Sequence, residues 1–183
     1  APLASATPVH DLKMGAYDDP RWIELLRDVV VDETFHRLRT HPLVLRAVSP
    51  ALEGARPVSE HGDICRVVSD SDPERTTRAH QDRFYIKGQG PLATAWLPLG
   101  MCPRELGPLA ILPRSHHDGL RPHLGQGMGR QGCAFDDDAT WHASDLECGD
   151  VLVFGGLTIH CALPNRMPRK LRLSVDYRFR PAT

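Results

Sequence analysis

The stretch KLRLSVDYRFR, residues 170–180, alternates strictly between apolar and polar side chains. Successive side chains of a β-strand point to opposite faces of its sheet, so this pattern predicts a strand with one apolar and one polar face. The polar face carries Arg172, Ser174, Asp176, Arg178 and Arg180. Such a face is either the solvent-exposed side of an edge strand or the wall of a barrel mouth, and the two alternatives imply different folds.

Short β-like runs fill the chain from about Val58 onward, where Gly and Pro interrupt them. We expect strands at residues 63–69, 78–84, 92–99, 109–113, 150–156, 157–163 and 170–180. Strands of this number and spacing favour an all-β sandwich or barrel. Upstream, near-helical apolar spacing predicts helices over 18–42 and 41–54 that cover one face of a sheet.

The segment 115–145 is poor in strand signals and rich in Gly, His and Asp. We interpret it as a long insertion, and insertions of this length are often functional or mobile. It lacks the apolar periodicity that would dock it, so we expect a mobile loop that contributes to the wall of a binding pocket.

Charge and cysteine usage exclude several kinds of partner. The formal net charge of the 183 residues is −1, so there is no electrostatic case for nucleic acid or an anionic membrane. No apolar run approaches membrane-spanning length. The five cysteines are scattered without a CxxC pair, which fits reduced thiols in a cytoplasmic protein.

His80 and Asp82 stand two residues apart in the stretch RTTRAHQDRFY. On a strand their side chains share one face and can bind one metal ion together. His160, which ends the apolar run GLTIH, is the best candidate for a third ligand, although a histidine on such a strand is more often a core residue. Two histidines and one carboxylate form the facial triad of non-haem Fe(II) oxygenases, which leaves coordination sites open.

An iron of this kind takes electrons from an organic acid, and the acid needs a cationic anchor. Arg172 and Ser174 fit that role inside a barrel mouth, since a guanidinium binds a carboxylate through two hydrogen bonds and the hydroxyl adds a third. The Arg-x-Ser pair follows His160 by twelve residues. This spacing favours the barrel-mouth interpretation of the polar face.

Four segments in this order resemble the phytanoyl-CoA dioxygenase-like family of Fe(II)/2-oxoglutarate oxygenases: AHQD, TAWLPLGMCPRELGPLAILPRSHHDGL, DLECGDVLVFGGLTIHCALPN and LRLSVDYRFRP. The resemblance implies a mainly β fold, a double-stranded β-helix (jelly-roll, cupin-like) barrel flanked by N-terminal helices. We expect one domain, 1–183, with a helical flank at 1–57 and a jelly-roll core at 58–183. The resemblance also implies Fe(II) bound by His80, Asp82 and His160, and 2-oxoglutarate bound by Arg172 and Ser174.

The implied reaction uses O₂ to hydroxylate or otherwise oxidise a C–H bond of a small organic molecule, while 2-oxoglutarate is decarboxylated to succinate. Related halogenases have a small residue in place of the carboxylate, so Asp82 favours a hydroxylase. Two alternatives stay open: a catalytically silent jelly-roll module that binds a metal or ligand, and a cupin-like iron enzyme that uses no keto acid. The Arg-x-Ser pair argues against the second.

Other residues have weaker assignments. Thr94 and Trp96 share a face of the run LATAWLPL and are expected to line the cosubstrate pocket, while Arg66 and Gln81 are expected at the substrate. The sequence also departs from the family. Arg114 replaces the usual glycine of a PGSH turn, and family members carry a further N-terminal segment that helps to close the pocket.

Overall fold

The computed structural model describes residues 24, 27–29, 31–70, 76–125 and 132–182. The helical elements are α2 (Glu33–Leu38), α3 (Pro42–Val48), α4 (Asp82–Tyr85) and the 3₁₀ turns η2 (Ser49–Leu52), η3 (Arg104–Leu106) and η4 (Ser115–Asp118). The strands are β1 (Pro57–Val68), β2 (Ala93–Pro98), β3 (Leu109–Ile111), β4 (His123–Leu124), β5 (Gly132–Cys133), β6 (Leu152–Gly155), β7 (His160–Ala162) and β8 (Arg172–Pro181).

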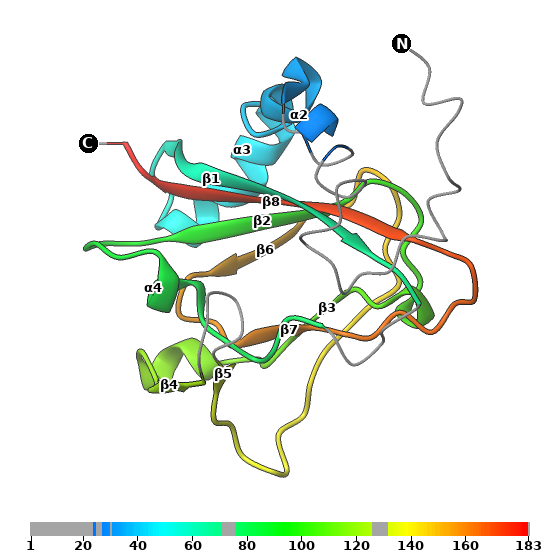
Figure 1. Cartoon of the computed structure of the whole chain (residues 1–183). Coiled ribbons are helices and arrows are strands. Elements are labelled where there is room, and N and C mark those ends of the chain that lie inside the picture. The colour runs from blue at the N-terminus through cyan, green and yellow to red at the C-terminus, as the bar shows by residue number, and fades with distance from the viewer. Residues whose placement is uncertain (1–23, 25–26, 30, 71–75, 126–131, 183) are drawn as a thin grey trace.

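Two antiparallel sheets lie face to face, and helices cover the outer face of the larger one (Figure 1). The larger sheet has the strand order β1–β8–β2–β6, and the smaller sheet pairs β3 with β7. A separate hairpin of β4 and β5 lies at the edge of the smaller sheet (Figure 1). This is the expected mainly β jelly-roll with flanking N-terminal helices.

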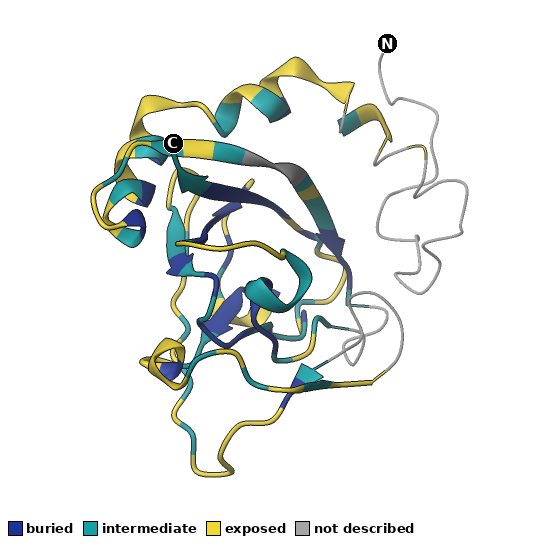
Figure 2. Cartoon of the chain, turned by 90° about the vertical axis from the view of Figure 1, so that its left-hand side faces the viewer, coloured by how far each residue is buried: buried dark blue, intermediate teal, exposed yellow. Residues whose placement is uncertain are grey.

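Strand β8 holds the larger sheet together, because it pairs with β1 on one side and β2 on the other. On its apolar face Val175, Tyr177 and Phe179 are fully buried against Val48 and Leu52 of the helical layer. Each buried side chain of this size contributes about 1.5–3 kcal/mol relative to an exposed one. The strands beneath the helices carry the buried residues, whereas the outer side of the helices is exposed (Figure 2).

The space between the two sheets holds a second apolar cluster that includes Trp96, Leu109, Phe154 and Ala162. The polar face of β8 looks into the same space, and its side chains from Arg172 to Arg178 are all buried. The predicted alternation is therefore confirmed. The polar face lines the interior of the barrel and is not the wet side of an edge strand.

The first predicted helix, over 18–42, is broken, and residues 18–23, 25–26 and 30 lie outside the described residues. The Asp32 side chain accepts hydrogen bonds from the backbone amides of Thr34 and Phe35 at 2.7 and 3.3 Å, so a new helix begins there. The second predicted helix forms α3 and continues into the 3₁₀ turn η2, followed by Gly54 with a positive φ of 82°.

The predicted strand over 78–84 was wrong. His80 forms only an isolated bridge, and Asp82 begins the short helix α4.

The prediction of an undocked insertion over 115–145 was also wrong for its described part. A backbone bridge joins Ile111 to His142, and β4 pairs with β5. Backbone hydrogen bonds hold this segment in place, and such bonds leave no apolar periodicity in the sequence. Residues 126–131 lie outside the described residues.

All five cysteines are free thiols. None of the helices in the described ranges has both the length and the apolar character needed to span a lipid bilayer.

Candidate metal centre

Main-chain pairing brings the two candidate histidines together. The amide of His80 donates to the carbonyl of His160, and the amide of His160 donates to the carbonyl of His80, both at 3.0 Å. Residues paired in this way place their side chains on the same face, and the two imidazole centroids are 4.2 Å apart. The start of β7 therefore lies directly beside the segment that carries His80.

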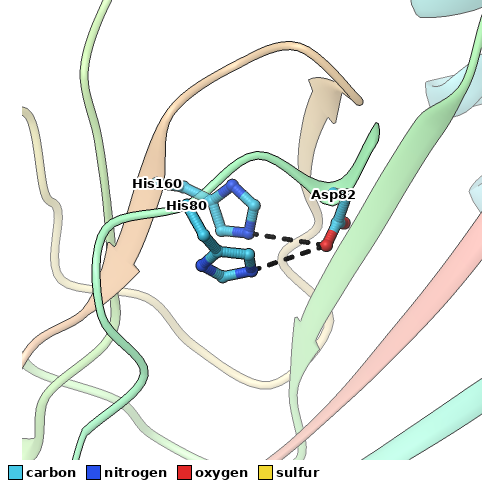
Figure 3. A group of neighbouring side chains, drawn as sticks. All are labelled: His80, Asp82 and His160. Carbon is cyan, nitrogen blue, oxygen red and sulfur yellow. Dashed lines mark ion pairs between the residues drawn. The ribbon is translucent and has the colours of Figure 1, made fainter. Parts of the chain in front are cut away.

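Asp82 joins them because one extended residue, Gln81, separates it from His80. Gln81 has φ −119° and ψ 128°, so the side chains before and after it point to the same side. The Oδ1 atom of Asp82 lies 3.6 Å from Nε2 of His80 and 3.9 Å from Nε2 of His160 (Figure 3). All three residues are at least 95% buried, and their ligand atoms lie within 4.8 Å of one another.

Hydrogen bonds at the far side of each ring orient the histidines. Nδ1 of His80 contacts the carbonyl of Arg78 at 2.8 Å, and Nδ1 of His160 contacts the carbonyl of Thr158 at 3.0 Å. A carbonyl only accepts, so Nδ1 of each ring carries a hydrogen and Nε2 is the nitrogen that faces Asp82. Burial, with a smaller contribution from His80, lowers the pKa of His160 to about 4, so this ring is neutral near pH 7.

The carboxylate of Asp82 is fixed by two neighbours on the larger sheet. Thr94 donates its hydroxyl hydrogen to Oδ2 at 2.5 Å, and Arg178 approaches both oxygens at 3.3 and 3.4 Å. Burial alone would raise the pKa of Asp82, but the charge of Arg178 and the contacts with His80 and His160 hold it well below its usual range. The carboxylate is therefore ionised, and its Oδ1 faces both histidines.

This set of donors fits a divalent metal such as Fe(II). Two imidazole nitrogens and one carboxylate oxygen that face one point are the ligands of the facial triad, and each has a supporting hydrogen bond behind it.

A chain of alternating charges runs from Asp82 along the inner face of the larger sheet. Arg178 lies 3.5 Å from Asp176, and Nε of Arg66 donates to Asp176 at 2.7 Å. Arg66, Thr94, Asp176 and Arg178 line the same pocket as the two histidines.

Arg172 and Ser174 lie further along the inner face of β8 and do not line that pocket. The Arg172 side chain is fully buried, donates to the carbonyl of Gly107 and lies 5.8 Å from the centre of the Trp96 ring. Ser174 Oγ and Trp96 Nε1 are buried and have no hydrogen-bond partner within the described part of the chain. Buried polar atoms normally have a partner, so these positions fit the carboxylate of a bound organic acid.

Gln81, which was expected at the substrate, is not among the residues that line this pocket. Its side chain points away from its two neighbours and is fully buried, with hydrogen bonds to the backbone of Gly119, Arg121 and Leu157. Sequence reasoning missed the contact of Arg178 with Asp82. The alternation of 170–180 had placed Arg178 on the inner face but gave no sign of which neighbour it meets.

A jelly-roll barrel that buries two imidazoles and a carboxylate around one point defines the class of mononuclear non-haem metalloproteins. Within that class the chain belongs to the phytanoyl-CoA dioxygenase (PhyH) family, whose family model matches residues 6–172.

The chain is similar to two hydroxylases from Streptomyces. It is 37% identical over 124 residues to the 1-deoxypentalenic acid 11-beta-hydroxylase of Streptomyces arenae, and 34% identical over the same length to that of Streptomyces exfoliatus. Each match covers 62% of this chain and 44% of the relative. The chain therefore matches less than half the length of these relatives.

Solved structures share the fold. The non-heme alpha ketoglutarate dependent epimerase SnoN from nogalamycin biosynthesis superposes with a TM-score of 0.66 at 25% identity, over 84% of this chain and 59% of that one. EvdO2 from Micromonospora carbonacea var. aurantiaca, solved with 2-oxoglutarate, gives a TM-score of 0.63 at 22% identity, over 82% of this chain and 64% of that one.

Proposed function

We propose that the chain forms the catalytic core of an Fe(II)- and 2-oxoglutarate-dependent dioxygenase that hydroxylates or otherwise oxidises a C–H bond of a small organic molecule. The observation that carries this proposal is the convergence of His80, Asp82 and His160, with both Nε2 atoms and Oδ1 turned toward one point. Membership of the phytanoyl-CoA dioxygenase family and similarity to hydroxylases support it.

Fe(II) bound with 2-oxoglutarate and O₂ supplies the oxidising chemistry, and 2-oxoglutarate is converted to succinate and CO₂. In this proposal His80 and His160 bind the metal through Nε2, and Asp82 binds it through Oδ1. Thr94 holds Oδ2 of Asp82 by its hydrogen bond, which leaves Oδ1 as the single carboxylate ligand. Arg178 keeps the carboxylate ionised and oriented.

Arg172 and Ser174 are the proposed anchor of the cosubstrate. A guanidinium binds a carboxylate through two hydrogen bonds, and Ser174 Oγ and Trp96 Nε1 can supply further donors. Trp96 also belongs to the apolar cluster between the sheets, together with Phe154. This cluster keeps water away from the wall beside the metal site, and a low dielectric strengthens the electrostatic contacts there.

The carboxylate of Asp82 supports a hydroxylase-type reaction over halogenation, since its oxygen occupies the ligand position that a halide would need. We propose Arg66 as a contact for the substrate, because its side chain is about one quarter exposed on the pocket wall and its Nε is held by Asp176. We further propose a cytoplasmic location with no nucleic-acid or membrane partner.

The test is succinate formation by the purified chain with Fe(II), 2-oxoglutarate and ascorbate, in parallel with oxygen consumption. We expect slow turnover even without substrate, and its loss in Asp82→Ala. The matched control is Asp145→Ala, whose carboxylate is 65% exposed and remote from the triad. Metal binding without succinate would indicate a silent binding module. Oxygen consumption without succinate would indicate an iron enzyme that uses no keto acid.

A further inference from the structure

Gln81 separates two proposed metal ligands in sequence, and its side chain forms hydrogen bonds with backbone atoms. Its side-chain Nε2 donates to the carbonyls of Leu157 at 2.6 Å and Gly119 at 2.8 Å. Its Oε1 accepts from the amide of Arg121 at 2.8 Å, and its own amide donates to Nε2 of His123 at 3.0 Å. Gly119, Arg121 and His123, which are alternate residues of the insertion, therefore all contact Gln81.

His123 is fixed for that contact. Its Nδ1 contacts the carbonyl of Arg121 at 2.9 Å, which leaves Nε2 as the acceptor for the Gln81 amide. Its ring stacks on Phe84 with centroids 4.1 Å apart and an angle of 10° between the planes. Phe84 lies in α4, which begins at Asp82, so this ring contact also joins the insertion to the segment that carries the ligands.

The other arm of the β4–β5 hairpin contacts the same segment. The amide of Cys133 donates to the carbonyl of Ala79 at 2.8 Å. The neighbouring Gly132 passes close to the same carbonyl, because a Cβ at this position would lie 3.2 Å from it. The segment 79–81 is thus held by the insertion through these contacts, while His80 is held by β7 through its pairing with His160.

The backbone angles of Gln81 set the relative direction of His80 and Asp82, because it is the single extended residue between them. A displacement of residues 119–123 would leave Oε1 of the buried Gln81 amide without its partner and Nε2 with only the carbonyl of Leu157, which favours a movement of Gln81 together with these residues. The ligand pair and the insertion are therefore mechanically linked through one side chain.

We propose that Gln81 is a positioning residue that couples the metal site to the insertion. It holds His80 and Asp82 in the metal-binding arrangement while residues 119–123 stay in place. By reciprocity, a metal ion bound at the site stabilises the docked position of residues 119–123. This inference rests on the metal site of the proposed function, but it makes a separate claim about the backbone of the insertion.

Hydrogen exchange of the wild-type chain with and without Mn(II) is the first test, in oxygen-free buffer and with binding followed by calorimetry. Bound Mn(II) is expected to slow exchange at the amides of Arg121 and Cys133, which donate to Gln81 and Ala79. The amide of Gly54, hydrogen-bonded to Ser49 in the helical layer, serves as the internal control and is expected to stay unchanged.

Gln81→Leu is the second test, because it keeps the size of the side chain and removes its polar atoms. Gln89→Leu, at an exposed position, is the matched control. We expect Gln81→Leu to raise the Kd for Mn(II) about 10- to 100-fold and to abolish the metal-dependent protection at Arg121. A merely structural role would lower stability to the same extent with and without metal and leave the Kd unchanged.

Each outcome decides the proposal. If the wild-type chain binds Mn(II) and exchange at Arg121 does not respond, the coupling is wrong and the proposed function stands. If Gln81→Leu folds and keeps the wild-type Kd, the coupling is also wrong. A variant that fails to fold leaves the decision to the wild-type exchange. A wild-type chain that binds neither Mn(II) nor Fe(II) would overturn the metal site itself.

Discussion

His80 and His160 exchange two backbone hydrogen bonds of 3.0 Å, although 79 residues separate them in the sequence. Main-chain pairing therefore sets the separation of their rings, and the carbonyls of Arg78 and Thr158 set the orientation of each ring. Both Nε2 atoms face Oδ1 of Asp82. The predictions that follow test this arrangement as a metal site.

Metal binding is expected to raise the thermal stability of the chain. A ligand that binds only the folded state at 100 times its Kd stabilises it by about 2.7 kcal/mol. Mn(II) in such excess should therefore increase the Tm, as measured by scanning calorimetry. The increase should disappear in His160→Ala and persist in His142→Ala, since the side chain of His142 is exposed and away from the triad. An equal increase in Tm in both variants would show that the metal binds elsewhere on the chain.

Thr94→Val is expected to weaken metal binding, because Oδ2 of Asp82 loses the hydroxyl that orients it. Supporting hydrogen bonds of this kind typically change metal affinity about 10- to 100-fold. Thr94→Ser keeps the hydroxyl and should retain most of the affinity. Titration calorimetry with Mn(II) measures both. Equal affinity of the valine and serine variants would show that the hydroxyl does not position Asp82.

Arg172→Ala is expected to raise the KM for 2-oxoglutarate by a factor of about 10 to 1000, since a charge-assisted pair contributes roughly 1.5–3 kcal/mol or more. Steady-state succinate formation measures this change. Arg104→Ala is the control, because the Arg104 side chain is 65% exposed.

An unchanged KM in Arg172→Ala would assign the anchor elsewhere. Arg178 and Arg66 would then be the candidates, because both line the pocket beside the triad. Lys87 would follow, whose ammonium lies 4.7 Å from the centre of the Phe84 ring. Arg178 also contacts Asp82, so the metal affinity of Arg178→Ala must be measured beside its KM.

The metal-free chain is expected to lose stability in mild acid. Burial lowers the pKa of His160 from the ordinary 6.5 to about 4, so within this interval the unfolded chain binds a proton that the folded chain does not. The free energy of unfolding is therefore unaffected by His160 above pH 6.5 and decreases as the pH falls toward 4. The loss of stability that His160 causes is about 2 kcal/mol between about pH 7.5 and about pH 5. Urea unfolding at several pH values should show a smaller pH dependence in His160→Asn than in the wild type.

Arg114→Gly is expected to stabilise the fold by up to about 1 kcal/mol. Arg114 has φ 67° at the start of η4, a left-handed conformation that is costly for any residue with a Cβ and free of that cost for glycine. Arg104→Gly, at a position with negative φ, should destabilise instead. Urea midpoints compare the two. A loss of stability in Arg114→Gly would mean that the side chain makes contacts that outweigh the strain.

Local sequence determined the elements and their faces. The alternation of residues 170–180 placed Arg172, Ser174 and Arg178 on one face of a strand, and this face does line the barrel. The His-x-Asp pair and the motifs that follow it predicted the family and the candidate ligands. These features are visible without coordinates because side-chain direction repeats over one or two residues and depends only on local backbone geometry.

Tertiary structure decided which of these residues meet. The pairing of β2 with β8 sets Thr94 opposite Arg178, and both then reach Asp82. The segment 78–84 was predicted as a strand, yet a single extended residue followed by a helical turn suffices to align His80 with Asp82. The contacts of Gln81 with Gly119 and Arg121 join positions far apart in the sequence, and its local sequence gives no sign of them. Register and loop docking are long-range hydrogen-bond choices, and a pattern of neighbours along the chain carries no information about them.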